Sequence, residues 1–237
     1  MVYKAQSGHP GGSLSCIDIL VGLYRSAMRF DPEKPSWGDR DRFVMSKGHA
    51  SPAVYSILRD VGVLDDTDLD GFRSLGSVCQ GHVDRKWTEG VDFSAGSLGM
   101  GLSFGLGSAL AARLDISERH TWVLLGDGEI QEGQIWEAAM AASHLEVTNI
   151  TAIIDRNRIQ NDNFVEEQMR VGDIPSKFRS FGWNVIEING HDMSEIVGAL
   201  SEAKGSIGPT AIVAATVKGK GVSFMEDNPA FHGAAPN

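Results

Sequence analysis

Trp122-Val123-Leu124-Leu125-Gly126-Asp127-Gly128 is the stretch that most clearly indicates a fold, because a short apolar run stops at a glycine and leads into an acidic turn. A second apolar run, residues 150–154, is rich in β-branched side chains and stops just before Asp155 and Asn157. Apolar runs of this length, bounded by turn residues, predict buried parallel strands. Ligands in an open α/β sheet bind beyond the carboxyl ends of the strands, so we expect Asp127 and Asn157 to face one crevice.

These two side chains offer the oxygen ligands that Mg²⁺ takes in proteins. Mg²⁺ prefers six oxygens at roughly 2.0–2.1 Å and combines one or two protein groups with phosphate oxygens. We expect the Asp127 carboxylate, the Asn157 side-chain oxygen and the Ile159 carbonyl to bind Mg²⁺, with Ca²⁺ or Mn²⁺ able to replace it. Two diphosphate oxygens and one water would complete the shell. Residues 129–140 predict a helix, whose N-terminal N–H groups favour an anion.

The rest of the chain alternates between strand and helix patterns. Residues 13–30 carry apolar side chains at spacings of three and four, which predicts an amphipathic helix with Ser13 or Ser15 near its cap. This alternation predicts an α/β fold with a mostly parallel sheet covered by helices on both faces. The other expected strands are residues 42–46, 184–188 and 211–215, and the other expected helices are residues 50–61, 97–114 and 194–204.

Residues 97–114 are unusual for a helix because they contain Gly99, Gly101, Gly105 and Gly107. Each interior glycine costs a helix roughly 0.8–1.0 kcal/mol relative to alanine. We therefore expect another backbone or a ligand to approach this helix closely. The acidic run at residues 65–68 is interpreted as a solvated loop rather than a metal site.

The composition fits one soluble domain of 237 residues, with 42% hydrophobic and 22% charged residues. No apolar run approaches the roughly 20 residues needed to cross a bilayer, so no membrane association is expected. The N-terminus shows no signal or transit pattern, which predicts a cytoplasmic protein. A net charge of −10 without a basic cluster argues against nucleic acid as a partner. Cys16 lies in an apolar stretch and is expected to be a reduced core residue.

The two strand ends together resemble the Gly-Asp-Gly to Asn signature of thiamine diphosphate (ThDP) enzymes, and further segments narrow the resemblance to transketolases. It implies a ThDP-binding fold, here one diphosphate-binding domain over residues 1–237. Family members continue beyond both ends of this stretch, so both ends are expected to be trimmed. Met100 stands at a position where a glutamine is common in the resembled family. The segments are Ser7-Gly8-His9-Pro10-Gly11-Gly12-Ser13-Leu14-Ser15, Asp41-Arg42-Phe43-Val44-Met45-Ser46-Lys47-Gly48-His49-Ala50, Gly81-His82-Val83-Asp84, Ser97-Leu98-Gly99-Met100-Gly101, Gly126-Asp127-Gly128-Glu129-Ile130-Gln131-Glu132-Gly133 and Phe231-His232-Gly233.

Histidines supply the expected catalytic groups. His9, His49, His82 and His232 each lie in a glycine-containing turn segment, and loops of this kind line crevices. Imidazoles donate to phosphate oxygens and exchange protons near neutral pH. The resemblance implies that His49 and His232 line the diphosphate and substrate hydroxyls, with His232 taking a hydroxyl proton from the ketose. It implies that His9 and His82 contact the substrate, which makes His9, His82 and His232 catalytic.

The remaining histidines, His120, His144 and His191, match no chemical pattern and are expected to be surface or core residues.

The resemblance also implies a set of contacts with the cofactor. The Gly96 carbonyl would accept from the aminopyrimidine, Leu98 would pack on that ring, and the Gly128 N–H would bind the diphosphate. Lys218 matches a position near the diphosphate, with a solvated loop lysine as the alternative. The expected cofactor-binding residues are His49, Gly96, Ser97, Leu98, Gly126, Asp127, Gly128, Glu129, Glu132, Asn157, Ile159, Lys218 and His232.

The glutamate that activates ThDP in the resembled family belongs to a separate pyrimidine-binding domain, for which 237 residues leave no room. The resemblance therefore implies the diphosphate-binding subunit of a split transketolase. With a C-terminal subunit, in a heterotetramer, it would move a two-carbon ketol unit from a ketose phosphate to an aldose phosphate, the chemistry of the pentose phosphate pathway. Glu132 and the glycine-rich helix would face the partner. The alternatives are another ThDP enzyme, of the deoxyxylulose-phosphate synthase or 2-oxoacid dehydrogenase type, and a non-catalytic ThDP-binding regulatory subunit.

Overall fold

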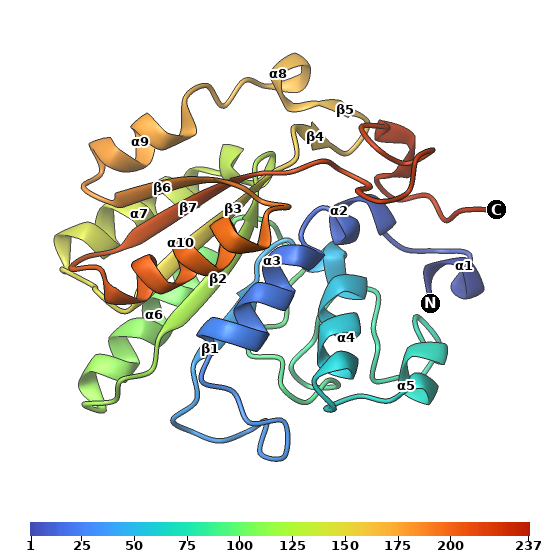
Figure 1. Cartoon of the computed structure of the whole chain (residues 1–237), viewed down its shortest axis with the longest axis horizontal. Helices are drawn as coiled ribbons and strands as arrows, with labels where there is room; N and C mark the ends of the chain where they lie inside the picture. The colour runs from blue at the N-terminus through green and yellow to red at the C-terminus, as the bar shows by residue number, and fades with distance from the viewer.

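A five-stranded parallel sheet forms the centre of the molecule (Figure 1). The computed structural model describes all residues from 1 to 237. All pairings within this sheet are parallel, and each strand lies within two residues of its expected bounds, so the predicted fold class is confirmed. Across the sheet, the strands follow the order β1 (Arg42–Met45), β2 (Thr121–Gly126), β3 (Ile150–Arg156), β7 (Thr210–Ala215) and β6 (Asn184–Asn189).

Helices cover both faces of the sheet, and each face has its own apolar core. The side chains of β2 alternate between the two, since Trp122 and Leu124 belong to one core while Val123 and Leu125 belong to the other. The first core is covered by α3 (Ile17–Gly22), α4 (Ser51–Asp60) and α10 (Met193–Gly205), and the second by α6 (Met100–Leu114), α7 (Gly133–His144) and α9 (Ile174–Ser180).

Short elements complete the chain, and none of the helices is long and apolar enough to cross a membrane. Cys16 and Cys79 are both buried free thiols, as expected for Cys16. The short elements are α1 (Val2–Ala5), α2 (Pro10–Leu14), the π-helix η1 (Leu23–Ala27), the 3₁₀ helices η2 (Gly48–Ala50), η3 (Glu129–Gln131) and η4 (Pro229–Phe231), α5 (Asp66–Asp70), α8 (Val165–Gln168), and the hairpin strands β4 (Ile159–Gln160) and β5 (Asn163–Phe164).

The prediction of one helix over residues 13–30, capped by Ser13 or Ser15, is wrong. This segment is divided among α2, α3 and η1, and α2 already begins at Pro10 with His9 as its N-cap residue. Proline suits a first helical turn because its missing N–H has no partner there. Ser13 and Ser15 are buried, and the Ser15 hydroxyl donates to Asp155 at the end of β3. A long-range contact of Ser15, rather than a cap, therefore accompanies the break in the helix.

Two other predicted elements also differ in the structure. Residues 129–140 do not form one helix, because Glu132 is extended (ψ 127°) and separates η3 from α7. The acidic run is not a loop but the start of α5, where Asp65 and Asp68 form a reciprocal capping box. It is solvent-exposed, and no cluster of three or more His, Cys, Asp or Glu side chains in the structure could hold a metal ion.

The glycine-rich helix α6 packs on the sheet at the glycines, as the sequence predicted for a close backbone contact. A Cβ atom on Gly101 would lie 2.3 Å from Ser46 Oγ, and one on Gly105 would lie 2.4 Å from a Val123 methyl carbon. Gly107 instead opens onto free space. The helix begins at Met100 rather than at residue 97, because Gly99 precedes it with a φ of 84°, which favours glycine.

Candidate functional site

The predicted crevice exists at the carboxyl ends of β2 and β3. Gly126 and Asp155 are paired across the two strands, so the turns that follow them leave the sheet side by side. Asp127 and Asn157 are both buried and line one cavity of about 410 Å³. The sequence prediction that these two side chains meet is therefore confirmed.

The expected metal ligands present oxygen atoms to this cavity. The Asp127 carboxylate accepts hydrogen bonds from the backbone N–H groups of Gly128 (2.9 Å) and Arg158 (2.6 Å). The Asn157 side-chain oxygen accepts from the Ile159 N–H (3.1 Å), and the Ile159 carbonyl accepts from Lys218 Nζ (2.7 Å). Burial, and then the neighbouring Asp155 charge, raise the pKa of Asp127 to about 6. A buried carboxylate held by two backbone donors, beside two further oxygens, fits a divalent cation.

An ion pair between Lys47 and Asp155 lies beneath these ligands. Both side chains are buried, and Lys47 Nζ also donates to the Gly12 carbonyl (2.7 Å). Asp155 further accepts from Ser15, Thr216 and the Asn157 amide group, the last at 3.0 Å. Burial alone would raise the pKa of Asp155, but the Lys47 charge and these hydrogen bonds lower it below its usual value. This network orients the Asn157 amide, so its oxygen is the atom left for a metal.

Four histidines meet beside these ligands, as the sequence predicted. The ring centroid of His9 lies 5.1 Å from that of His49, 6.2 Å from that of His82 and 5.4 Å from that of His232. His49 and His232 are 5.2 Å apart. Burial is the main cause that lowers the pKa of His9 to about 4 and that of His232 to about 3. The rings are therefore neutral at pH 7, and His9 Nδ1 is buried without any hydrogen-bond partner.

Lys218 connects the histidines to the expected metal ligands. Its ammonium group contacts His232 Nδ1 (2.7 Å) as well as the Ile159 carbonyl. The side chain is buried, so the alternative of a solvated loop lysine is wrong. Burial, followed by the nearby Lys47 charge, lowers the pKa of Lys218 to about 8.

The remaining expected residues are arranged less uniformly. Gly96 and Leu98 line the cavity, and Leu98 is 39% exposed, whereas Ser97 is exposed and does not line it. The Glu129 carboxylate is already engaged by Ser46 and by the N–H groups of Gly99 (2.9 Å) and Gly126 (3.0 Å). Glu129 thus connects the end of β2 to the start of α6.

Two more of the expected groups lie at the edge of the cavity. Glu132 lines the cavity and is exposed to solvent. The Gly128 N–H already donates to Asp127, so a diphosphate oxygen would have to share this donor. A Cβ atom on Gly128 would lie 2.7 Å from Gln160 Cβ, which explains the need for glycine at this turn.

Sequence reasoning missed Lys47, Asp155 and the two glutamines that line the cavity, Gln131 and Gln160, which are joined by a 2.6 Å hydrogen bond. Lys47 lies two residues before His49 in one of the segments that carry the family resemblance, and that position was the available signal. Gln131 lies in another of these segments, so the same signal was available for it, whereas Gln160 carried no signal of its own.

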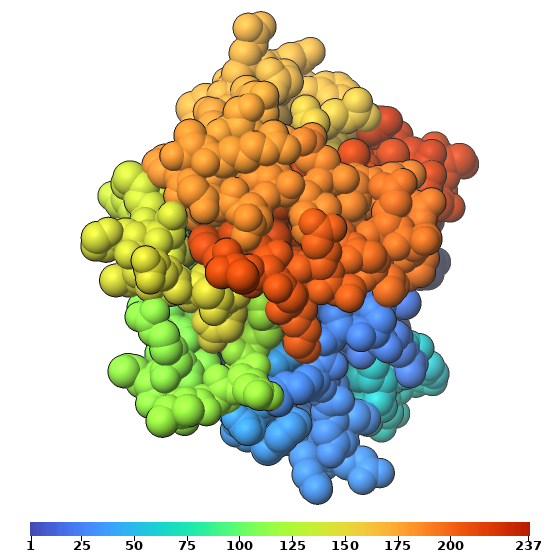
Figure 2. Space-filling view, turned by 60° about the vertical axis from the view of Figure 1, so that its left-hand side comes forward, coloured from blue at the N-terminus to red at the C-terminus, as the bar shows by residue number.

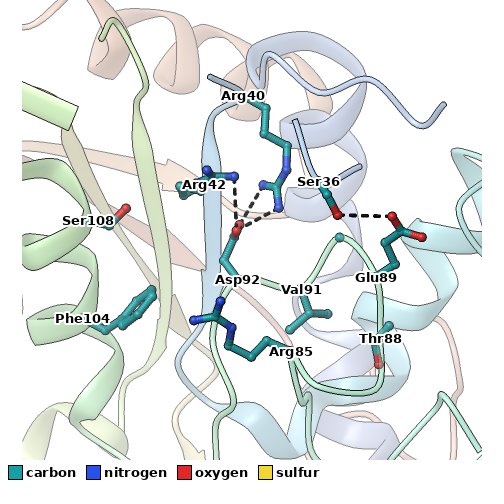
Figure 3. Close-up of a pocket in the computed structure, with 11 residues that line it drawn as sticks. Ser36, Arg40, Arg42, Arg85, Thr88, Glu89, Val91, Asp92, Phe104 and Ser108 are labelled. Atoms are coloured by element: carbon teal, nitrogen blue, oxygen red, sulfur yellow. Dashed lines mark hydrogen bonds and ion pairs between the residues drawn. The ribbon is translucent and has the colours of Figure 1, made fainter. Parts of the chain in front are cut away.

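A second pocket of about 320 Å³ lies near the start of β1 (Figure 3). Two of its arginines converge on one carboxylate, since Asp92 pairs with Arg40 (2.8 Å) and Arg42 (3.6 Å). Arg42 is the first residue of β1, so this pocket lies at the opposite edge of the sheet from Asp127. In α/β sheets ligands bind at the carboxyl edge, so we assign the functional site to the cavity of Asp127 and Asn157.

The fold is that of a ThDP-binding domain. The family described as "Transketolase, thiamine diphosphate binding domain" matches residues 1–237, and the chain belongs to this family. The resemblance inferred from the sequence is thereby confirmed, together with the transferase class and the ThDP-binding fold.

Relatives of two lengths resemble the chain. An apulose-4-phosphate transketolase subunit of Phocaeicola vulgatus is 42% identical over 100% of this chain and 84% of its own length. The 6-deoxy-6-sulfo-D-fructose transketolase subunit SqwG of Clostridium sp. is 42% identical over 97% of this chain and 84% of its own length. The human transketolase is 36% identical, and this chain covers 36% of it. The transketolase structure from Campylobacter jejuni has a TM-score of 0.92 at 38% identity, over 99% of this chain and 38% of that one.

Proposed function

We propose that this chain is the diphosphate-binding subunit of a split transketolase, and that residues 1–237 form one domain. With a second subunit that carries the pyrimidine-binding domain, it transfers a two-carbon ketol unit from a ketose phosphate to an aldose phosphate in the cytoplasm. The single observation that carries the proposal is the cavity in which Asp127, Asn157 and four histidines meet. The split arrangement is supported by the two relatives from Phocaeicola vulgatus and Clostridium sp., both of which are named as transketolase subunits.

The proposed cofactor contacts follow from the donors in the cavity. Asp127, the Asn157 side-chain oxygen and the Ile159 carbonyl hold Mg²⁺, or Ca²⁺ or Mn²⁺ in its place. Lys218 and His49 donate to the diphosphate, with the Gly128 N–H as a shared donor. When bound, ThDP supplies the carbon nucleophile that the side chains of this protein lack. Gly96 and Leu98 border the thiazolium and pyrimidine side, while Glu129 acts as a positioning residue.

The histidines are proposed to handle the substrate. His9 and His82 contact carbonyl or hydroxyl groups, since both side chains line the cavity. Lys218 donates to Nδ1 of His232, so the neutral ring carries its proton on Nε2 and can donate to an oxygen there. To accept a ketose hydroxyl proton, as proposed, Nε2 of His232 must instead be unprotonated, with the ring proton on Nδ1.

Exposed apolar side chains on α6 and α7 support a partner subunit. Met100 and Leu114 on α6 are 40% and 84% exposed, and Met140 on α7 is 49% exposed. Figure 2 shows the green and yellow-green surfaces of this part of the chain next to each other on one side of the molecule. Leu98 and the exposed Glu132 lie at the cavity edge beside this surface. We propose that the partner docks here and closes the site, within a heterotetramer.

Asp127→Ala tests the metal assignment. Titration calorimetry of the assembled complex with Mg²⁺ and ThDP should show at least a 10²-fold loss of affinity, because the variant removes the only charged metal ligand. Far-UV circular dichroism should stay unchanged. Asp66→Ala is the matched control, since Asp66 is an exposed carboxylate that lines neither this cavity nor the pocket beside it. Retained ThDP affinity in the Asp127 variant would exclude the metal assignment.

His232→Ala tests the catalytic assignment. It should keep most of the cofactor affinity and lower turnover by about 10²-fold, the usual scale of general acid–base help. Unchanged turnover would remove His232 from the mechanism. Product analysis with a ketose phosphate and with pyruvate as donors separates this function from that of a deoxyxylulose-phosphate synthase or 2-oxoacid dehydrogenase. A complete pair of subunits that transfers nothing to any aldose would instead support a regulatory role.

A further inference from the structure

His191 lies outside the cavity, yet both of its ring nitrogens make specific contacts. Nε2 accepts a hydrogen bond from the Val217 backbone N–H (2.9 Å), and Nδ1 lies 2.8 Å from a carboxylate oxygen of Asp18. A backbone N–H can only donate, so Nε2 is unprotonated and Nδ1 carries the proton that is given to Asp18. Asp18, at the start of α3, therefore fixes both the ring orientation and the tautomer of His191.

The contact falls on the segment that leaves the sheet towards the cavity. Strand β7 ends at Ala215, and Val217 lies between this strand end and Lys218. The residue before His191, Gly190, donates its N–H to the Ala215 carbonyl (2.8 Å). A Cβ atom on Gly190 would lie 2.4 Å from the Thr216 methyl carbon. The turn at residues 190–191 therefore packs tightly along the strand exit and holds it at two backbone groups.

Lys218 depends on this exit for its position. Its side chain crosses to the Ile159 carbonyl and His232 Nδ1, both at 2.7 Å, and it is buried. On its far side, the backbone is fixed because the Lys218 carbonyl accepts from the Asp227 N–H (3.0 Å) and the Gly219 N–H donates to the Gly11 carbonyl (3.0 Å). On its near side, the bond from the Val217 N–H to His191 is the anchor one residue before Lys218, and its loss would leave the Thr216 N–H as the nearest remaining anchor.

We propose that His191 is a positioning residue for the diphosphate site, acting through Val217 to hold Lys218 against His232 and Ile159. The role of Lys218 in binding diphosphate rests on the proposed function. The positioning of Lys218 by His191 does not depend on that function. His191 touches none of the groups that line the cavity, so it is not a catalytic residue. What His191 controls is the position of the Lys218 side chain.

The first test measures the accessibility of Lys218 and needs no cofactor. The full chain is treated briefly with an acetylating reagent at pH 8, and peptide mass spectrometry compares the modification of Lys218 with that of the more exposed Lys220. His191→Leu should raise the relative rate at Lys218 by about 10-fold, the scale of one lost buried hydrogen bond. His191→Gln, whose side-chain oxygen can accept from Val217, should stay close to the wild-type rate.

Two further variants keep this test decisive. Asp18→Ala leaves the ring in place but frees its orientation, and should give an intermediate rate even if the leucine variant does not fold. His120→Gln is the matched control, because His120 is a buried histidine whose Nε2 contacts Thr151 (2.8 Å) in the sheet. It should leave Lys218 protected. Wild-type protection of Lys218 in both His191→Leu and Asp18→Ala would overturn the proposal.

The second test uses binding of Mg²⁺ and ThDP to the assembled complex. His191→Leu should weaken binding by about 10-fold in the wild-type background and by less than about 2-fold in a Lys218→Met background. Equal losses in both backgrounds would indicate general structural damage and overturn the proposal. Absence of ThDP binding by the wild type would refute the proposed function, while the acetylation result would still decide the role of His191.

Discussion

Replacing Asp155 by asparagine should destabilise the chain more than replacing Lys47 by methionine, although the two side chains form one ion pair. The reason is the number of partners that each change leaves behind. In Asp155→Asn, the buried Lys47 ammonium loses its counter-ion and keeps only neutral acceptors, the Gly12 carbonyl and the amide oxygen of the new side chain. Without Lys47, the Asp155 carboxylate keeps hydrogen bonds from Ser15, Thr216 and Asn157.

The magnitudes follow from burial. The side chains of Lys47 and Asp155 are 3% and 0% exposed, and breaking a buried pair on one side costs about 3–5 kcal/mol. Asp155→Asn should reach this range. Lys47→Met should cost about 2 kcal/mol, because three donors still stabilise the carboxylate and the methionine is apolar. The double variant should be more stable than Asp155→Asn alone, because it carries no buried ammonium without a counter-ion.

The comparison is made by equilibrium urea unfolding at pH 7 without cofactor or metal. Burial would raise the pKa of Asp155, but Lys47 lowers it, so the carboxylate is ionised at pH 7. Its stabilising contribution is present above the unfolded pKa of about 3.9 and is lost only as the pH falls through the lower folded value. In a domain of this size, about 4 kcal/mol corresponds to roughly 8–16 °C in Tm.

Asp66→Asn provides the control for this comparison, since it removes a fully exposed partner of Arg59 and should leave the urea midpoint unchanged. Two results would refute the reasoning. One is an Asp155→Asn variant as stable as Lys47→Met. The other is a double variant whose loss of stability equals the sum of the two single losses.

Three other outcomes are expected. Gly101→Ala should destabilise the chain by about 1–3 kcal/mol in urea unfolding, because the added Cβ would overlap Ser46 Oγ. Gly107→Ala should instead stabilise the chain by up to about 1 kcal/mol, because a Cβ at Gly107 meets open space. Burial lowers the pKa of His120 to about 4, so the folded state favours the neutral ring and loses about 3 kcal/mol as the pH falls from 6.5 to 4. His120→Gln should flatten this part of the curve of unfolding free energy against pH; an unchanged slope would contradict the burial argument. Removing divalent cations with EDTA should lower ThDP affinity by at least about 10²-fold without changing the far-UV spectrum, and undiminished binding would contradict a metal-bridged diphosphate.

The sheet was predictable because its signal is local. β2 and β3 are apolar runs that end at glycine or aspartate, and parallel strands bring such ends to one edge. The placement of Asp127 beside Asn157 followed from this rule alone. The histidine cluster also needed the family resemblance, since four glycine-containing turns could have faced different sides of the molecule.

The breaks in helices were not predictable, because partners far along the chain decide them. Ser15 lies inside an amphipathic pattern, but its hydroxyl donates to Asp155, 140 residues away. Glu132 continues a good helical sequence, yet a Cβ atom on Gly99 would lie 2.7 Å from its side chain, so these two segments are in close contact. Periodicity describes which face of a helix is apolar and carries no information about such contacts.

The buried ion pair explains how a chain with a net charge of −10 can be suited to a diphosphate. Five buried charged groups lie in and around the proposed metal site: Lys47, Asp155, Lys218, Asp127 and Glu129. Lys47 is neutralised by Asp155, and the formal charges of all five groups, when ionised, sum to −1. A diphosphate adds several negative charges to this cavity, and its neutral histidines can donate hydrogen bonds but cannot balance charge. A divalent cation is the remaining source of positive charge, so the arrangement favours binding of the diphosphate together with its metal rather than by lysines alone.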